Sequence, residues 1–384
     1  MNICVLSSLL QENINDPFLK KIEKELKPNF IYPKEYQGDD VIFYIQTGGT
    51  EGVFLKLFDL IPKNKEIILI SSKENNSLAA SMEIASFLKA NNISCRIIHG
   101  NLDELIKPSI KLGVIGKPSD WLISSSLDKN NLFNKHHIEL IDIELDELYD
   151  IINNKVSYNL DSSEINFLKN ATLDENEIEV ALNIYGALKV LVDKYQLMGF
   201  TIRCFDLIGI YKNTGCLALS LFNKNGCIAT CEGDLKTLIT MYFCQKILGE
   251  PGFQANPSSI NDDPLSITFA HCTIPIQMLD SYKIVTHFES GIGVAIKGVI
   301  KAGPITLLKV DLDSNEYVCF EAKRIDLPYN NNLCRTQISF LINNEIKDYF
   351  LRKPLGNHHV ITLGKNKELL DSKLQEYGFM NVLK

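Results

Sequence analysis

Short apolar runs alternate with helical patterns through the first two thirds of the chain, and this alternation restricts the fold more than any other feature. Strand-like runs cover residues 3–6, 41–45, 66–71 and 95–99, and amphipathic helical patterns lie between them at 51–60 and 78–90. Short buried strands that alternate with helices predict a parallel sheet covered by helices on both faces. We therefore expect an N-terminal α/β domain over residues 1–110.

A second α/β domain is expected over residues 111–255. Strand-like runs lie at 112–116, 138–143, 200–207 and 227–231. A long helical pattern at 162–197 separates the second run from the third, and another at 235–248 follows the last. Gly249 directly follows the last helical pattern, where glycine commonly ends a helix. The fold class predicted for the first two thirds is thus α/β, with a parallel sheet in each of two domains.

The last third has a different pattern. Strand-like segments separated by turn residues run from 266 to 341, and a strand at 359–362 precedes a final helical pattern at 366–377. This spacing predicts an antiparallel, barrel-like β-rich domain over residues 256–384.

Composition excludes several classes of function. The chain of 384 residues has 39 basic and 47 acidic side chains, a net charge of −8, whereas nucleic-acid binders usually carry a basic excess. No apolar stretch is long enough to span a membrane, and the N-terminus has no basic signal-peptide region. We expect a cytoplasmic protein that binds a small molecule. The ten cysteines form no C-x-x-C pair, and we interpret them as buried thiols in a reducing compartment.

Nucleotide-binding motifs are missing from the sequence. The segment at 290–294 contains G-x-G without the third glycine and lies in the β-rich region, and no P-loop is present.

Ligand-type side chains gather where three strand-like runs end. Glu232 and Asp234 follow the run at 227–231, His271 ends a second run, and the pair His358-His359 begins a third. Carboxylates at the carboxyl end of a parallel strand face the crevice where α/β proteins bind ligands, although Asp234 could equally cap a helix. One carboxylate with one or two imidazoles suits Mn²⁺ or another divalent ion. Adjacent histidines on a strand point to opposite faces, so at most one of the pair can face the site.

Two further carboxylates are candidates. Glu289 lies two residues after His287, and this pair could contact a substrate or form a surface ion pair. Asp206 follows Arg203 near the expected end of the 200–207 strand, where a buried Arg–Asp pair is the alternative.

In order and residue type these segments resemble the L-fucose isomerase and L-arabinose isomerase superfamily, specifically its shorter fucose isomerase-like branch. The resemblance covers roughly residues 200–384 and rests on five segments: Cys231-Glu232-Gly233-Asp234-Leu235-Lys236-Thr237, Phe253-Gln254-Ala255-Asn256-Pro257-Ser258, Phe269-Ala270-His271-Cys272-Thr273, Thr286-His287-Phe288-Glu289-Ser290-Gly291-Ile292-Gly293-Val294 and Gly356-Asn357-His358-His359-Val360-Ile361.

The resemblance implies aldose–ketose isomerisation through an ene-diol, dependent on Mn²⁺, in a homo-trimer or homo-hexamer. By position it implies metal ligation by Glu232, Asn256, His271 and one histidine of the C-terminal pair. The fucose pattern favours His358 and the arabinose pattern favours His359. It also leads us to expect substrate contacts from Asn256, His287 and Asn357.

Asn256 departs from the family pattern. The related enzymes usually carry a carboxylate at this position, which binds metal and moves the proton, and an amide can bind a metal but is not a base. Glu232 is therefore the first candidate for the proton-transferring carboxylate, with Asp234, Asp206 and Glu289 behind it. Two alternatives stay open: a sugar-binding protein that has lost the base, and a metal-dependent epimerase or lyase on the same fold.

Overall fold

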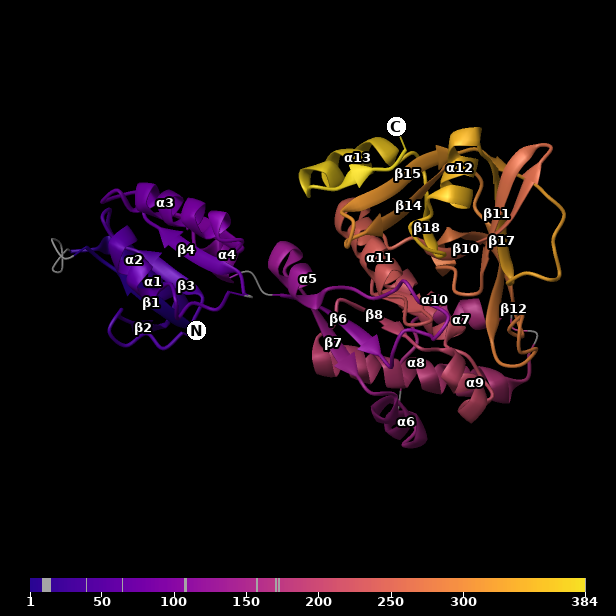
Figure 1. Cartoon of the computed structure of the whole chain (residues 1–384). Coiled ribbons are helices and arrows are strands. Elements are labelled where there is room, and N and C mark those ends of the chain that lie inside the picture. The colour runs from indigo at the N-terminus through magenta and orange to yellow at the C-terminus, as the bar shows by residue number, and fades with distance from the viewer. Residues whose placement is uncertain are drawn as a thin grey trace. The chain divides into compact units, whose positions relative to one another are not determined.

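The computed structural model describes residues 1–8, 15–38, 40–63, 65–106, 109–156, 158–169, 171 and 173–383. Its contacts divide the chain into two compact units, Met1–Pro108 and Ser109–Lys384 (Figure 1), and each is described by itself. No helix among the described residues is both long enough and apolar enough to cross a membrane.

The first unit contains a parallel sheet, which confirms the expected α/β architecture. Its strand order is β2-β1-β3-β4-β5, and all pairs are parallel. The strands are β1 (Asn2–Leu6), β2 (Asn29–Ile31), β3 (Ile42–Ile45), β4 (Ile67–Ser71) and β5 (Cys95–His99).

Helices cover both faces of this sheet. Helices α2 (Glu51–Leu57) and α3 (Ser77–Ala90) bury apolar side chains against one face, and α1 (Pro17–Leu26) packs against the other, where the segment leading into α4 (Asp103–Ile106) also lies. Burial on both faces explains why the strands are almost wholly apolar.

The second unit begins with a parallel sheet of order β7-β6-β8-β9. These strands are β6 (Ile110–Ile115), β7 (Ile138–Ile143), β8 (Gly199–Ile202) and β9 (Ile228–Cys231). One face packs against α6 (Leu145–Asn153), α8 (Glu175–Tyr195) and α10 (Cys216–Lys224). The other packs against α5 (Lys129–His136) and α11 (Leu235–Leu248).

Two expected elements in this unit are wrong in extent. The helical pattern at 162–197 corresponds to two helices, α7 (Ser162–Leu168) and α8, because Asp174 accepts a backbone hydrogen bond and begins α8 afresh; residues 170 and 172 lie outside the described residues. The strand expected at 200–207 ends at Ile202, and α9 (Phe205–Tyr211) follows.

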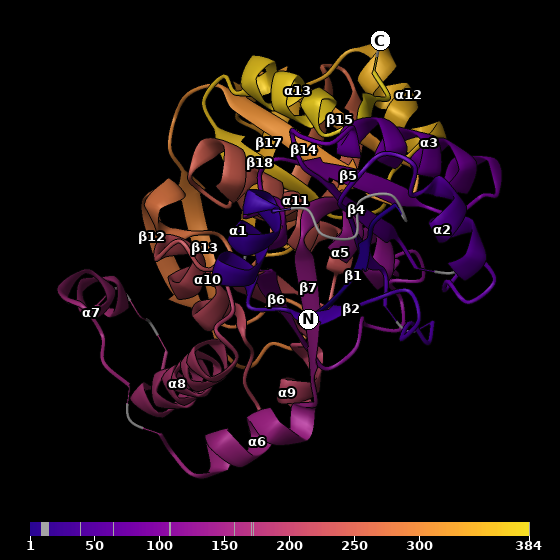
Figure 2. The ribbon, with the colours of Figure 1, turned by 90° about the vertical axis from the view of Figure 1, so that its left-hand side faces the viewer.

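A larger mixed sheet forms the β-rich region expected in the last third. Its order is β16-β17-β11-β10-β18-β14-β15-β19, and a β12–β13 hairpin lies beside it. The strands are β10 (Phe253–Asp262), β11 (Leu265–His271), β12 (Leu279–Val285), β13 (Ala295–Ile300), β14 (Ile305–Asp311), β15 (Glu316–Ala322), β16 (Arg324–Ile325), β17 (Thr336–Leu341), β18 (His359–Leu363) and β19 (Met380–Asn381). A short 3-10 turn at Ile276–Met278 precedes β12, and α12 (Asn344–Arg352) precedes β18. Figure 2 shows α13 (Lys367–Glu376) beside β15. The domain boundaries expected near residues 110 and 255 stay predictions.

Helix α11 lies between the two sheets of the second unit. It contacts β8 and β9 on one side and β14 and β18 on the other, as Figures 1 and 2 show. Its first ten residues are all buried, which agrees with a helix whose apolar residues are spread over every side. The N-terminus of this helix therefore meets strand ends from both sheets, and the candidate ligands gather there.

Candidate metal centre

Glu232 lies in a tight turn between β9 and α11. Its backbone is left-handed, with φ +67°, and so is that of Gly233, with φ +70°. A Cβ at Gly233 would lie 2.5 Å from the carbonyl oxygen of Lys117, so only glycine fits there. A non-glycine residue at positive φ is strained, and such strain persists where the surrounding structure holds it, often at functional sites.

A loop that follows β6 holds Glu232 in place. The Ser119 backbone N–H donates to the Glu232 carbonyl oxygen at 2.9 Å, and the Trp121 indole Nε1–H donates to Glu232 Oε2 at 2.7 Å. The other carboxylate oxygen, Oε1, is left to face the two histidines. Trp121 gave no signal in the sequence, because nothing in the local pattern links it to a residue more than a hundred positions later.

Two imidazoles face Glu232 Oε1. His358 Nε2 lies 3.4 Å from this oxygen and His271 Nε2 lies 3.8 Å from it. One ligand atom from each of the three residues lies within 4.8 Å of the others, and all three residues are buried. Such a group of one carboxylate and two imidazoles could hold a divalent metal ion.

Strand pairing explains this convergence. Strands β11, β10 and β18 are neighbours in the mixed sheet, where Asn256 pairs with Ala270 and Ala255 pairs with His359. His271 ends β11 and His358 precedes β18, so both lie beside Asn256 at one end of the sheet. The turn after β9 brings Glu232 to the same place.

The outer nitrogens of both rings are also engaged. His358 Nδ1 donates to Asp234 Oδ2 at 2.8 Å, and His271 Nδ1 lies 3.0 Å from Thr273 Oγ1. A histidine that ligates a metal usually donates its other ring N–H to a carboxylate, a backbone carbonyl or water, and the pair of His358 with Asp234 has this arrangement. His358 Nε2 is buried and makes no hydrogen bond among the described residues, so a cation beside Glu232 could take the place of the proton on this nitrogen.

Asp234 both caps α11 and orients His358. Its Oδ1 accepts hydrogen bonds from the Thr237 backbone N–H at 3.0 Å and the Ser125 hydroxyl at 2.8 Å. Its Oδ2 accepts from the Thr237 hydroxyl at 2.7 Å as well as from His358. The helix cap considered in the sequence is therefore present. Four hydrogen bonds from three residues enclose the Asp234 carboxylate, which supports His358 from the side away from Glu232.

Buried charges set the protonation of these groups. Burial raises the pKa of Glu232, but the two imidazoles outweigh burial and hold it well below its usual range. Burial also raises the pKa of Asp234, but the Lys309 charge and the His358 hydrogen bond outweigh burial, and the pKa lies well below its usual value. Burial lowers the pKa of His271, whereas Asp234 and Glu232 overcome burial at His358 and raise its pKa.

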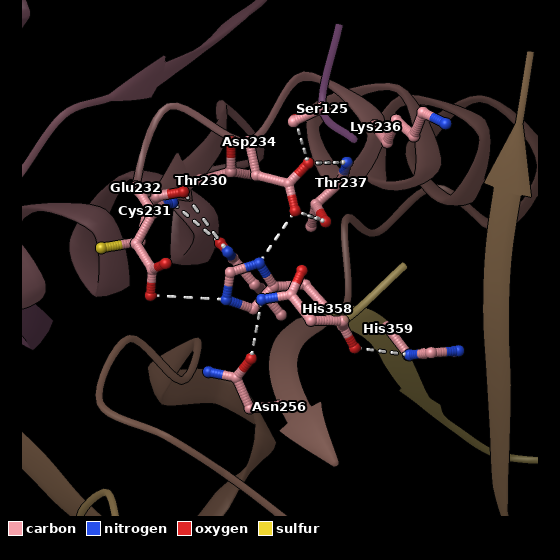
Figure 3. Close-up of polar contacts among 12 residues, drawn as sticks. Ser125, Thr230, Cys231, Glu232, Asp234, Lys236, Thr237, Asn256, His358 and His359 are labelled. Carbon is pink, nitrogen blue, oxygen red and sulfur yellow. Dashed lines mark hydrogen bonds and ion pairs between the residues drawn. The ribbon is translucent and has the colours of Figure 1, made fainter. Parts of the chain in front are cut away.

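His359 faces away from the group, as Figure 3 shows. Its Nδ1 donates to the Asn357 carbonyl oxygen at 2.8 Å, which leaves Nε2 as the acceptor for the Tyr349 hydroxyl at 2.8 Å. Both ring nitrogens are thus occupied, and the ring packs against Phe269 and Phe350. Of the two adjacent histidines, the structure brings His358 and not His359 to Glu232.

Glu232 and His271 also line a small cavity. Its lining includes the predicted substrate contacts Asn256 and His287 as well as Glu289. Asn256 Oδ1 accepts a hydrogen bond from Asn357 Nδ2 at 3.3 Å. His287 is buried, and desolvation lowers its pKa to about 4, so its imidazole is neutral.

Asp206 does not reach this cavity lining. The expected strand end is the start of α9, and both carboxylate oxygens of Asp206 accept from Arg203 Nε at 3.1 Å. Arg203 also binds Asp120 through two hydrogen bonds. The Arg–Asp pairing considered as the alternative in the sequence is therefore present.

The expectation that all ten cysteines are free thiols is wrong for two of them. A disulfide joins Cys204 to Cys231, directly before Glu232. The other cysteines are free. The spacing of 27 residues between Cys204 and Cys231 gave no signal in the sequence, because the two residues meet only when β8 and β9 pair.

Comparison with known proteins gives one weak similarity. No family model matches the chain. Over 92 residues it is 27% identical to the sulfoquinovose isomerase of Clostridium sp. (strain MSTE9), a match that covers 24% of this chain and 21% of that protein. The chain thus matches about a fifth of the length of this relative. The similarity is to a sugar isomerase, and the fucose isomerase-like branch stays a prediction.

Proposed function

We propose that the chain is a divalent-metal-dependent isomerase that interconverts the aldose and ketose forms of a monosaccharide or sugar derivative through an ene-diol. The observation that carries this proposal is the convergence of Glu232, His271 and His358 beside a cavity. The partial similarity to a sugar isomerase supports the same reaction class.

The donor set fits a divalent cation such as Mn²⁺. One carboxylate oxygen and two imidazole nitrogens are ligands that Mn²⁺ accepts. The buried His358 Nε2 makes no hydrogen bond among the described residues, which is costly unless a cation binds there. Asn256 would add an amide oxygen from the same cavity wall. A bound divalent ion would supply positive charge that stabilises negative charge on the sugar oxygens.

The surrounding residues would fix this geometry. Asp234 holds the His358 ring so that Nε2 faces the site, and Trp121 fixes the rotation of the Glu232 carboxylate. The polar groups of His287 and Asn357 would bind sugar hydroxyls, because they lie on or beside the cavity wall.

A second candidate, a sugar-binding protein without turnover, is favoured by one observation. Asn256 stands where related isomerases carry a carboxylate, and an amide cannot accept the proton. Binding of metal and sugar without exchange of the sugar C2 hydrogen would support this candidate over the isomerase.

Metal removal and return tests the isomerase. Treatment with a chelator should abolish exchange of a C2 deuteron with solvent across a panel of aldoses, both neutral and with an anionic group at C6. Mn²⁺ should restore it, and NMR would follow both exchange and ketose formation. Full activity after complete metal removal, verified by elemental analysis, would contradict the proposal.

We also propose that the protein is cytoplasmic and, as the family resemblance implies, that it forms a homo-trimer or homo-hexamer. Light scattering of the purified protein tests the assembly. A monomer with full activity would contradict it.

A further inference from the structure

We infer that Glu289 is the residue that moves the proton between C2 and C1 of the sugar, in place of the carboxylate that Asn256 lacks. This inference rests on the proposed isomerase function and adds a catalytic residue to it. It gives the proton-transfer role to the last of the four carboxylates considered in the sequence.

Position limits the choice to two carboxylates. Among the described residues that line the cavity, Glu232 and Glu289 are the carboxylates. Asp234 is enclosed with four hydrogen bonds, and Asp206 is held by Arg203 outside the cavity lining. Neither Asp234 nor Asp206 can therefore touch a sugar bound in the cavity.

Geometry then separates Glu232 from Glu289. Both oxygens of Glu232 are engaged, one by the Trp121 indole and one by the two imidazoles that complete the metal group. Glu289 makes no hydrogen bond or ion pair with any residue in the described part of the chain. It is therefore the cavity carboxylate with oxygens free to accept a proton.

Glu289 lies on a loop that the structure holds firmly. Arg335 binds the Thr286 carbonyl oxygen at 2.8 Å, and the His287 N–H donates to the Ile292 carbonyl oxygen at 3.2 Å. At the other end, a Cβ on Gly293 would lie 2.9 Å from Asn213 Cα, so the loop packs closely there. These contacts fix the loop backbone on both sides of Glu289, which places the carboxylate at the cavity before the substrate arrives.

The environment of Glu289 favours a proton carrier. Partial desolvation, followed by the negative charge of Glu232, raises the pKa of the Glu289 carboxyl above its ordinary value, although the side chain remains exposed. A carboxylate with a raised pKa takes a proton from carbon more readily and can return it.

The step balances without an oxidant or reductant. The Glu289 carboxylate removes the C2 proton of the open-chain aldose, the C2–H electron pair becomes the C1–C2 double bond, and the carbonyl pair moves to O1. The O2 proton passes to O1 within the cis ene-diol. Protonated Glu289 then delivers its proton to C1, which leaves a carbonyl at C2.

Glu289→Gln tests this assignment because it removes basicity and keeps the shape of the side chain. Mn²⁺ affinity would be measured by calorimetry, and C2 deuteron exchange and ketose formation by NMR. We expect exchange and kcat to fall about 100-fold or more, the usual scale for loss of a general base, with Mn²⁺ affinity within about threefold of wild type. Glu179→Gln, on an exposed position of α8, is the matched control and should change neither quantity.

The outcomes separate the two proposals. Exchange by Glu289→Gln within about threefold of wild type would overturn the role of Glu289 and leave the isomerase proposal standing. An equal loss of Mn²⁺ affinity and exchange would overturn it too, since Glu289 would then support the metal group. Wild-type protein that binds Mn²⁺ but exchanges no sugar in the panel would overturn both. Glu289→Asp, which keeps the carboxylate, should retain more exchange than Glu289→Gln.

Discussion

The adjacent histidines His358 and His359 allow a paired test of the candidate metal centre. Both side chains are fully buried and one residue apart, so alanine at either position removes the same atoms. Only His358 directs a free ring nitrogen toward Glu232, because both nitrogens of His359 are occupied by Asn357 and Tyr349. Metal affinity and folding stability should therefore respond differently to the two substitutions.

His358→Ala should weaken Mn²⁺ binding by about 100-fold or more. Removing an outer partner of a metal ligand alone costs roughly 10- to 100-fold, and His358 is a candidate ligand itself. A 100-fold loss corresponds to about 2.8 kcal/mol of binding free energy. The variant also removes one of the four hydrogen bonds to Asp234, at a cost of about 1–3 kcal/mol of folding free energy.

His359→Ala should instead lower folding stability with little effect on the metal. Its ring packs against Phe269 and Phe350 and accepts from the Tyr349 hydroxyl, so truncation opens a cavity and removes a buried hydrogen bond. Together these losses cost about 2–5 kcal/mol, the range for large core truncations. Mn²⁺ affinity should stay within about threefold.

Calorimetric titration of chelator-treated protein with Mn²⁺ would give the affinities, and urea unfolding of the metal-free protein would give the stabilities. Equal losses of Mn²⁺ affinity in the two variants would refute the geometry described for this site. A larger loss in His359→Ala would assign the ligand to the other histidine.

Three further predictions concern Trp121, Asn256 and His136. Trp121→Phe removes the hydrogen bond to Glu232 and should weaken Mn²⁺ about tenfold by calorimetry; an unchanged Kd would contradict the positioning role. Asn256→Asp should tighten Mn²⁺ without raising kcat, whereas a sharp rise in kcat would mean that the site had lacked its base. Desolvation, then the charges of neighbouring lysines, lowers the pKa of His136 to about 4. Folding stability should therefore fall as pH drops from about 6.5 to 4, because the unfolded imidazole binds a proton first. After allowance for partial solvent screening, His136→Phe should remove about 2 kcal/mol of this loss in urea unfolding at a series of pH values, and an unchanged pH dependence would contradict it.

The fold could be predicted where local pattern decides it. Strands buried on both faces must be apolar throughout, so the alternation with helices predicted both parallel sheets. The pattern failed on the extent of two elements. Asp174 divides the long helical pattern, and the strand expected from 200 ends early because the chain turns into α9 after Ile202. The spacing of apolar residues indicates neither the break at Asp174 nor the end of the strand at Ile202.

The candidate site could be predicted only in part. Residue type and order identified Glu232, His271 and both C-terminal histidines, and the alternation of side chains on a strand correctly required the two histidines to diverge. The choice of His358 needed the partners of each ring. Those partners, Asp234 for one and Tyr349 for the other, come from distant elements.

The supporting residues explain why a ligand list alone does not describe such a site. Glu232 holds a strained backbone angle, and its orientation depends on Ser119 and Trp121 from the loop after β6. The same loop supplies Ser125 to the carboxylate of Asp234, which in turn orients His358. One segment outside the recognisable motifs thus contacts a proposed ligand directly and supports a second through Asp234. Changes in this loop should therefore alter metal affinity even where every candidate ligand is unchanged.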